Sequence, residues 1–151
     1  MLNSIQKKYD ICRDISRYVR GRKVYRIRAL RDFSDVKAGD LGGWIESEKN
    51  LSQTGNCWIY DDAVAMEDAE VKDDATVGSH AVVSGNAVVK NRAFVIGRVV
   101  VSGRAKVGSR AVVSGNAEIT GRAVVGGDVV VSGNAKVGGH SLVGGRAYVK
   151  G

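Results

Sequence analysis

Small and branched apolar residues recur at a fixed spacing along the last two thirds of the chain. From residue 57 the sequence divides into sixteen consecutive hexads without an insertion, the last of them one residue short. The third position of every hexad is apolar, usually Val, and the first position is usually Ala. Uninterrupted self-similarity at a short period predicts a repeat architecture.

Each hexad is typical of a short strand followed by a turn. Side chains alternate along a strand, so the first and third positions face one side and the second and fourth face the other. The fifth position is usually Gly, and the sixth is usually Asn, Arg, Asp or His, which suits a turn. Because no single hexad can bury its Val, we expect each strand to stack on its equivalent in the next coil, about 4.8 Å away.

The first third of the chain follows a different pattern. Five apolar residues lie at helical spacing: Ile5, Tyr9, Cys12, Ile15 and Val19. They predict a helix over residues 4–20 that ends at Gly21. Residues 23–30 alternate apolar and basic side chains, which predicts a strand, and residues 38–50 form a glycine-rich turn around Trp44. We expect this part to cap the open end of the stack, which would otherwise expose unpaired strand edges.

The hexads resemble the hexapeptide repeat of left-handed parallel β-helix proteins, in which three hexads form one triangular coil. The resemblance covers about two thirds of the chain and implies a little over five coils. We therefore expect an all-β solenoid, a left-handed parallel β-helix, with a small N-terminal α+β cap. The expected division is a basic helix and strand cap over residues 1–50 and the β-helix over residues 51–151.

Residues 35–63 carry a narrower resemblance. They are similar to an entrance segment of enterobacterial and phage or prophage hexapeptide-repeat proteins that are named as transferases. The matching residues are Gly42-Gly43-Trp44, Leu51-Ser52-Gln53 and Asn56-Cys57-Trp58-Ile59-Tyr60-Asp61. This resemblance implies a phage or prophage origin. It also implies the fold of those proteins, but no particular chemical activity.

Charge divides the chain into three zones. The net charge is +7, and it is the sum of +8 over residues 1–31, −9 over residues 32–74 and +8 over residues 75–151. Two interpretations are open for each basic zone: an ordinary solvated face, or a surface that binds an anionic partner.

The N-terminal basic zone is the stronger candidate for anion binding. Its residues are Arg13, Arg17, Arg20, Arg22, Lys23, Arg26, Arg28 and Arg31, and Tyr18 and Tyr25 lie among them. This mixture suits phosphate contacts together with base stacking. It suits equally well an internal pairing with the acidic residues Asp61, Asp62, Glu67, Asp68, Asp73 and Asp74.

The corners of the predicted coils provide further candidates. With three hexads per coil, the sixth positions stack, so that Arg104 lies over Arg122 and Arg92 lies over Arg110. Stacked guanidinium groups suit a phosphate held in a fork geometry. Alternatively, they are solvated side chains whose repulsion is screened by salt.

One face of the predicted prism gathers the aromatic residues of the repeat. Its outward positions are Trp58, Tyr60, Thr76, Phe94, Ile96, Val112, Val130 and Tyr148. An exposed apolar strip predicts a contact surface, either for a homo-oligomer (a trimer or a dimer) or for the N-terminal helix. Simple β-propensity on an exposed sheet is the third interpretation.

The sequence offers little for catalysis. Many left-handed β-helix proteins are acyltransferases that use a histidine, and the only histidines here are His80 and His140. Neither has an acidic residue in its own hexad or an inserted loop beside it, so we predict that both are turn residues. Two histidines are too few for the three-histidine metal site of the carbonic-anhydrase branch. Cys12 and Cys57 read as buried apolar positions, so we expect no metal, no cofactor and no catalytic residue.

These observations favour a non-enzymatic binding protein, phage- or prophage-encoded, that blocks or sequesters a host component. The predicted partner is a host protein, a nucleoprotein, a nucleic acid or a nucleotide, bound through the basic surfaces and the apolar face. The alternatives are an acyltransferase of the acetyl-CoA type that uses His80 or His140, and a structural virion or tail component. Because no signal peptide or transmembrane-length run is present, the sequence predicts no membrane association and a cytoplasmic location, in the host if phage-encoded.

Overall fold

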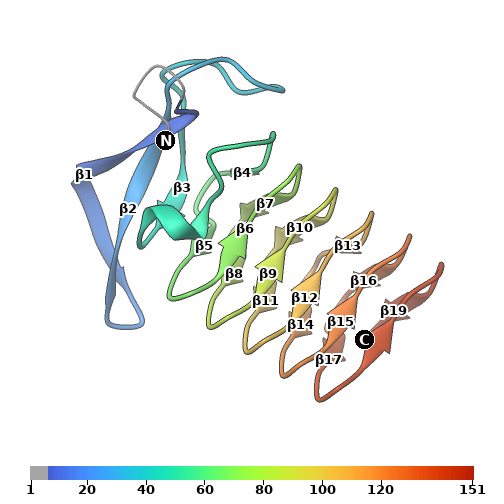
Figure 1. The fold of residues 1–151 in the computed structure, drawn as a ribbon. Helices are drawn as coiled ribbons and strands as arrows, with labels where there is room; N and C mark the ends of the chain where they lie inside the picture. The colour runs from blue at the N-terminus through green and yellow to red at the C-terminus, as the bar shows by residue number, and fades with distance from the viewer. Residues whose placement is uncertain (1–6) are drawn as a thin grey trace.

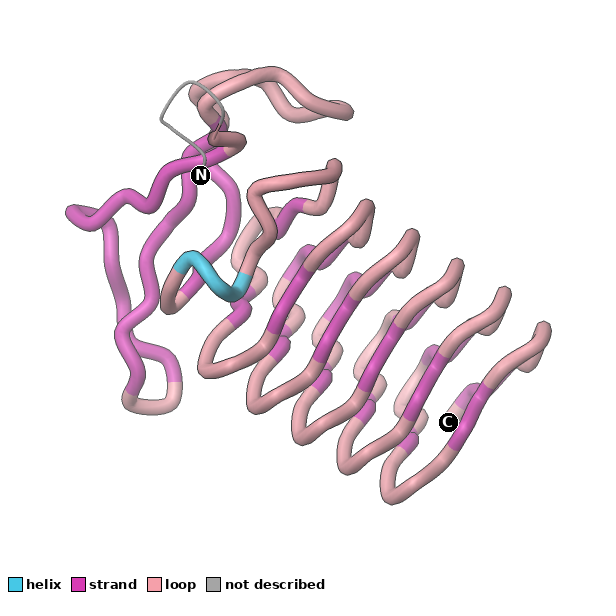
Figure 2. Tube along the Cα trace, viewed as in Figure 1, coloured by secondary structure: helices cyan, strands magenta, loops and turns pink. Residues whose placement is uncertain are grey.

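Successive coils stack so that their equivalent strands form three sheets, which are the walls of the protein in the computed structural model (Figures 1 and 2). The structure describes residues 7–151. The strands of the hexads run parallel, and the stack has about six turns. Val82 pairs with Val100, and Val100 pairs with Glu118, so each coil takes 18 residues, or three hexads. The predicted all-β parallel solenoid is therefore confirmed.

The first face is a six-stranded sheet of β4 (Trp58–Ile59), β7 (Thr76–Ser79), β10 (Phe94–Gly97), β13 (Val112–Val113), β16 (Val130–Ser132) and β19 (Tyr148–Lys150). The second face contains β5 (Val64–Ala65), β8 (Val82–Val83), β11 (Val100–Val101), β14 (Glu118–Ile119) and β17 (Lys136–Val137). The third face contains β6 (Glu70–Val71), β9 (Val88–Val89), β12 (Lys106–Val107), β15 (Val124–Val125) and β18 (Leu142–Val143).

The first and third positions of the hexads form the core, as the alternation of side chains requires. Ala105 and Val107, for example, are completely buried. Each buried Val contributes about 1.5–3 kcal/mol relative to an exposed one, and the inward residues of all three faces and of neighbouring coils form the single core that buries it. The fifth residue of a hexad turns the corner with a positive φ, which Asn91 (59°) adopts as well as the glycines.

The cap at the N-terminal end is made of strands. The second face continues into β3 (Leu41–Ile45), β2 (Arg22–Ala29) and β1 (Tyr9–Val19), and the only helical segment within residues 7–151 is the short 3-10 helix η1 (Glu48–Asn50). The strand predicted over residues 23–30 is confirmed as β2. In Figure 1 the cap lies at one end of the stack and the C-terminus at the other.

The helix predicted over residues 4–20 is wrong where the structure describes it. β1 pairs antiparallel with β2, and Arg20 (φ 52°) and Gly21 (φ 80°) form the turn between them rather than a helix end. The strand register shifts between Cys12 and Ser16, so three residues of β1 have no partner there. This irregularity interrupts the alternation of apolar residues and produces a spacing that resembles a helix. Ile5 lies outside the described residues.

The first coil begins before the recognisable hexads. β3 runs parallel to β5, with Trp44 opposite Val64, and Leu51 bridges to Val71 on the third face. Gly43 permits this close approach, because a Cβ there would lie 2.5 Å from the carbonyl oxygen of Ala63. The division into a cap of residues 1–50 and a β-helix of residues 51–151 stays a prediction. Within residues 7–151 no helix is long and apolar enough to cross a membrane.

Candidate functional site

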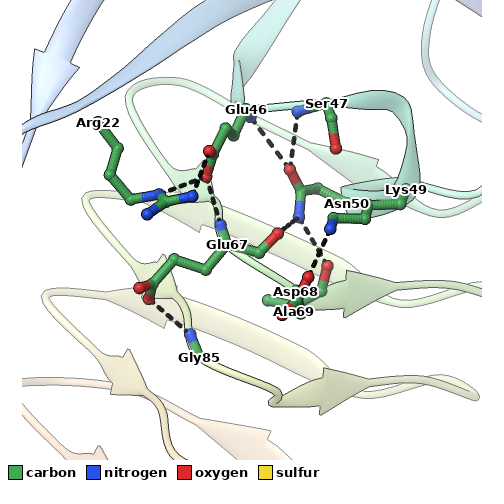
Figure 3. Close-up of polar contacts among 9 residues, drawn as sticks. All are labelled: Arg22, Glu46, Ser47, Lys49, Asn50, Glu67, Asp68, Ala69 and Gly85. Carbon is green, nitrogen blue, oxygen red and sulfur yellow. Dashed lines mark hydrogen bonds and ion pairs between the residues drawn. The ribbon is translucent and has the colours of Figure 1, made fainter.

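The cap turns several of its basic side chains towards the molecule itself. Arg22 binds Glu46 through two hydrogen bonds, from Nε to Oε1 at 2.8 Å and from the second guanidinium nitrogen to Oε2 at 2.6 Å (Figure 3). Arg26 lies 3.5 Å from the Asp62 carboxylate and donates to the carbonyl oxygen of Gly42 at 2.8 Å. The hydrogen bonds from Arg22 hold the pKa of Glu46 below its usual value.

Other basic side chains of this zone stack on aromatic rings. Arg17 and Arg26 lie over the Trp44 ring, with 4.5 and 4.7 Å to its centroid. Similar contacts pair Arg13 and Lys23 with Tyr25, and Arg31 with Phe33. In the part of the chain that the structure describes, Arg20 and Arg28 form neither an ion pair nor such a stack. Among the described residues, Asp62 is the one acidic residue of the predicted internal partners that forms an ion pair with this zone, through Arg26. Internal pairing with those acidic residues and anion binding therefore both stay predictions.

The basic residues of the solenoid have no such partners. All four ion pairs found among the described residues involve side chains between residues 7 and 68. Residues 75–151 contain ten Lys or Arg and two acidic residues, and none of the ten forms an ion pair within the described chain. The long part of the solenoid therefore presents an uncompensated positive charge to solvent.

The sixth residues stack along edges between the faces, as predicted. The Arg104 edge consists of Asp68, Asn86, Arg104, Arg122 and His140, and the Arg92 edge consists of Asp74, Arg92, Arg110, Asp128 and Arg146. Beside the Arg104 edge lies a shallow hollow of about 280 Å³, which is lined by Arg104, Arg122, Lys106 and Val124. Three of these four side chains are cationic, and none is acidic.

The Arg92 edge is less uniformly basic. Its hollow of about 390 Å³ is lined by Asn91, Arg92, Ser109, Arg110, Gly127 and Asp128. The Asp128 carboxylate adds a negative charge to the two guanidinium groups. We therefore regard the Arg104 edge, whose hollow lacks a carboxylate, as the better candidate for binding an anion.

The first face is only partly exposed. Trp58 is 2% exposed, because the rings of Tyr9 and Phe33 from the cap pack edge-on against it. Further along, Phe94 and Tyr148 are 45% and 67% exposed. The accessible strip therefore consists of Tyr60, Thr76, Phe94, Ile96, Val112, Val130 and Tyr148, and its role as an interface stays a prediction.

Within residues 7–151 neither histidine has the oriented acidic partner that a general base needs. His80 and His140 are both exposed and belong to different edges. Within residues 7–151 neither imidazole has a hydrogen-bond partner, and Asp62, one coil before His80 on the same edge, lies against Arg26 instead. The described residues also contain no group of three or more His, Cys, Asp or Glu side chains that could hold a metal ion.

A buried lysine, which no sequence pattern predicted, lies at the N-terminal end of the stack. The Lys8 ammonium donates to the carbonyl oxygens of Cys57 at 2.7 Å and Gly55 at 3.2 Å, and lies 3.3 Å from the Cys57 sulfur. Burial lowers the pKa of Lys8 and raises the pKa of the Cys57 thiol. Asn50 is a second such residue: its amide donates to the carbonyl oxygen of Ala69 at 2.8 Å.

Comparison with known proteins adds one relative. The chain is similar to the Escherichia coli (strain K12) protein named "Uncharacterized acetyltransferase YdcK", with 53% identity over 47 residues. These residues are 30% of this chain and 14% of YdcK, so the match spans about one seventh of that relative. No family model matches the chain. The observed solenoid and this match confirm the resemblance to hexapeptide-repeat proteins with a transferase name.

Proposed function

We propose that this protein is a non-catalytic binding protein that holds a nucleic acid along the basic edges of its solenoid. The observation that carries the proposal is the basic surface of residues 75–151, with ten Lys or Arg side chains and no ion pair within the described chain. The chain itself supplies only Glu118 and Asp128 as acidic residues in this region, so these cations stay available to an anionic partner.

The arrangement of the charges supports nucleic acid as the partner class. Arg104 and Arg122 occupy equivalent positions one coil apart, so two positive charges lie next to each other on the edge, at about the 4.8 Å spacing of stacked strands. Two adjacent guanidinium groups suit the phosphates of a nucleic-acid backbone, because guanidinium groups bind phosphate oxygens in pairs. In a phage or prophage setting, such binding would sequester a host nucleic acid or nucleoprotein.

Two charge-reversed variants of equal net charge test this proposal. Arg104→Glu/Arg122→Glu changes the Arg104 edge, and Arg20→Glu/Arg28→Glu changes two exposed cap residues that have no ion pair among the described residues. Fluorescence anisotropy with a labelled oligo-dT strand measures the dissociation constant of each variant. Each lost bidentate contact to phosphate is a charge-assisted hydrogen-bond pair, so we expect the edge variant to bind at least about tenfold more weakly than the cap variant.

Three results would contradict the proposal. Wild-type protein that leaves the anisotropy unchanged at low salt does not bind nucleic acid. An equal loss of affinity in both variants would show that binding depends on the net charge of the protein and not on the Arg104 edge. A larger loss in the cap variant would move the site to the N-terminal basic zone.

A second candidate function is acetyl transfer, and the name of YdcK favours it. In that case His80 or His140 would act as the general base. The test is release of free thiol from acetyl-CoA in the presence of amine and alcohol acceptors, with His80→Ala and His140→Ala measured beside the wild type. Turnover that one of these changes abolishes, with the fold intact, would replace the binding proposal. Turnover that neither changes would exclude both histidines.

A further inference from the structure

The corners of the coils carry backbone amides that the solenoid itself does not use. Hydrogen bonds between coils come from the second, fourth and sixth residues of a hexad: Val100, Ser102 and Arg104 donate to the carbonyl oxygens of Ala117, Ile119 and Gly121. The fifth residue turns the corner, and outside the longer strands its N–H group has no backbone acceptor among the described residues, except at Gly151 in the last hexad. These amides need another partner, or they face solvent.

The chain's own carboxylates fill the first of these positions on the Arg104 edge. The amide of Glu67 donates to Oε1 of Glu46 at 2.7 Å, and the amide of Gly85 donates to Oε1 of Glu67 at 2.9 Å (Figure 3). The Glu46 carboxylate also receives the two hydrogen bonds from Arg22. Here, one carboxylate is bound jointly by a corner amide and a guanidinium group.

The next two corners of the same edge lack this side chain. The amides of Gly103 and Gly121 have no acceptor among the described residues, because the residue one coil earlier is a glycine in each case, Gly85 and Gly103. A Cβ built on Gly103 would lie 2.9 Å from the amide nitrogen of Gly121. A side chain at residue 103 would therefore lie against that amide, as Glu67 lies against Gly85.

At these same two corners the edge changes from acidic to basic. The sixth residue is Asp68 beside Glu67, but it is Arg104 beside Gly103 and Arg122 beside Gly121. Lys106 joins the two arginines around the hollow of about 280 Å³. The two amides without an acceptor among the described residues thus belong to the residues that directly precede Arg104 and Arg122, where the internal carboxylates stop.

We infer that the Gly103 and Gly121 amides, together with Arg104, Arg122 and Lys106, bind one phosphate group of the partner. This inference rests on the proposed function and specifies the site at which the nucleic acid is held. Each of the two non-bridging oxygens of a backbone phosphate can accept more than one hydrogen bond, so one phosphate can accept from a corner amide and from two guanidinium groups at once.

Titration of the ¹⁵N-labelled protein with inorganic phosphate, at constant ionic strength, tests the site directly. The amide signals of Gly103 and Gly121 are the reporters, and those of Gly115 and Gly133 are internal controls. The control amides occupy the same hexad position on another edge and also lack a partner among the described residues, but the next residues are Asn116 and Asn134. We expect saturable shifts at Gly103 and Gly121 that are at least threefold larger than those at the controls. Equal shifts at all four amides, or none, would overturn the inference.

A matched pair of variants adds a second test. Gly103→Glu places a carboxylate against the Gly121 amide, in the conformation that Glu67 already adopts with φ 59°. Gly115→Glu adds the same charge and the same crowding on the other edge, where a Cβ would lie 2.8 Å from the amide nitrogen of Gly133. We expect phosphate to shift the Gly121 signal in Gly115→Glu but not in Gly103→Glu. A Gly121 shift that persists in Gly103→Glu would overturn the inference.

The two proposals fail in different ways. If oligo-dT binds the wild type and Gly103→Glu equally well, and phosphate moves neither reporter, the nucleic-acid function stands and this site is wrong. If phosphate moves both reporters but oligo-dT does not bind, the phosphate site stands and the nucleic-acid function is wrong.

Discussion

The carboxylate of Glu67 accepts a hydrogen bond at 2.9 Å from the amide of Gly85, which lies one coil further along the solenoid. Glu67 donates its own amide to Glu46 in the cap at 2.7 Å. The first corners of this edge are therefore closed by acidic side chains that belong to the chain. At the corners that follow, the amides of Gly103 and Gly121 have no acceptor among the described residues, and the next residues are arginines.

Removal of the Glu67 side chain should weaken the junction between the first coils. Glu67→Ala leaves the Gly85 amide without its acceptor, and we expect the free energy of unfolding to fall by about 1 kcal/mol. Urea unfolding followed by circular dichroism measures this change. Glu70→Ala is the control, because Glu70 is exposed on the third face and removes the same charge. Equal effects of the two changes would show that the hydrogen bond to Gly85 contributes nothing.

The Arg22–Glu46 pair should make stability depend on pH. Arg22 lowers the pKa of Glu46 in the folded state, so the stabilisation is present above the unfolded-state pKa of about 4.3 and is lost as the pH falls through the lower folded-state value. Glu46→Gln lacks this contribution at every pH. The difference in unfolding free energy between wild type and variant should be largest at neutral pH and shrink in acid. A difference that stays constant with pH would contradict this account.

Lys8 should be important for folding despite its charge. Lys8→Met keeps the length of the side chain but removes the donor that the carbonyl oxygens of Cys57 and Gly55 share. Each buried acceptor that loses its partner costs about 1–3 kcal/mol, so we expect a clearly lower midpoint of urea unfolding. Lys7→Met, at the neighbouring and less buried position, should change the midpoint little. A stable Lys8→Met protein would mean that these carbonyl groups find other donors.

The exposed strip of the first face should hold subunits together if the protein is an oligomer. Phe94→Asp places a charge in the middle of this strip, and light scattering should then give the mass of one chain, 16.0 kDa, instead of a multiple of it. Leu142→Asp is the control, since Leu142 is 79% exposed on the third face. An unchanged mass for Phe94→Asp would show that this face is not the interface.

The sequence was sufficient for the solenoid because its hexads repeat without interruption. Counting by threes placed Arg104 beside Arg122 correctly, since partners in adjacent coils are 18 residues apart within the hexads. The cap was harder to predict. A strand irregularity after Cys12 imitates helical spacing, and such an irregularity depends on the partner strand rather than on local sequence.

The buried polar residues and the amides without an acceptor could not be predicted from the sequence for another reason. Lys8 and Asn50 bind backbone carbonyl groups of residues that are 17 to 49 positions away in the chain, so nothing close to them in the sequence marks them as buried. The amides of Gly103 and Gly121 became visible only when the hydrogen bonds of each corner could be compared with those of the corner before it.

The salt dependence of nucleic-acid binding tests the central claim most directly. The association constant of oligo-dT should be measured over a range of salt concentrations for the wild type and for Arg104→Gln/Arg122→Gln. Each neutralised phosphate on a single strand contributes about 0.7 to the slope of log K against log salt, so loss of the two arginines that share one phosphate should reduce the slope by about 0.7. A slope identical to that of the wild type would show that the Arg104 edge does not contact the phosphates.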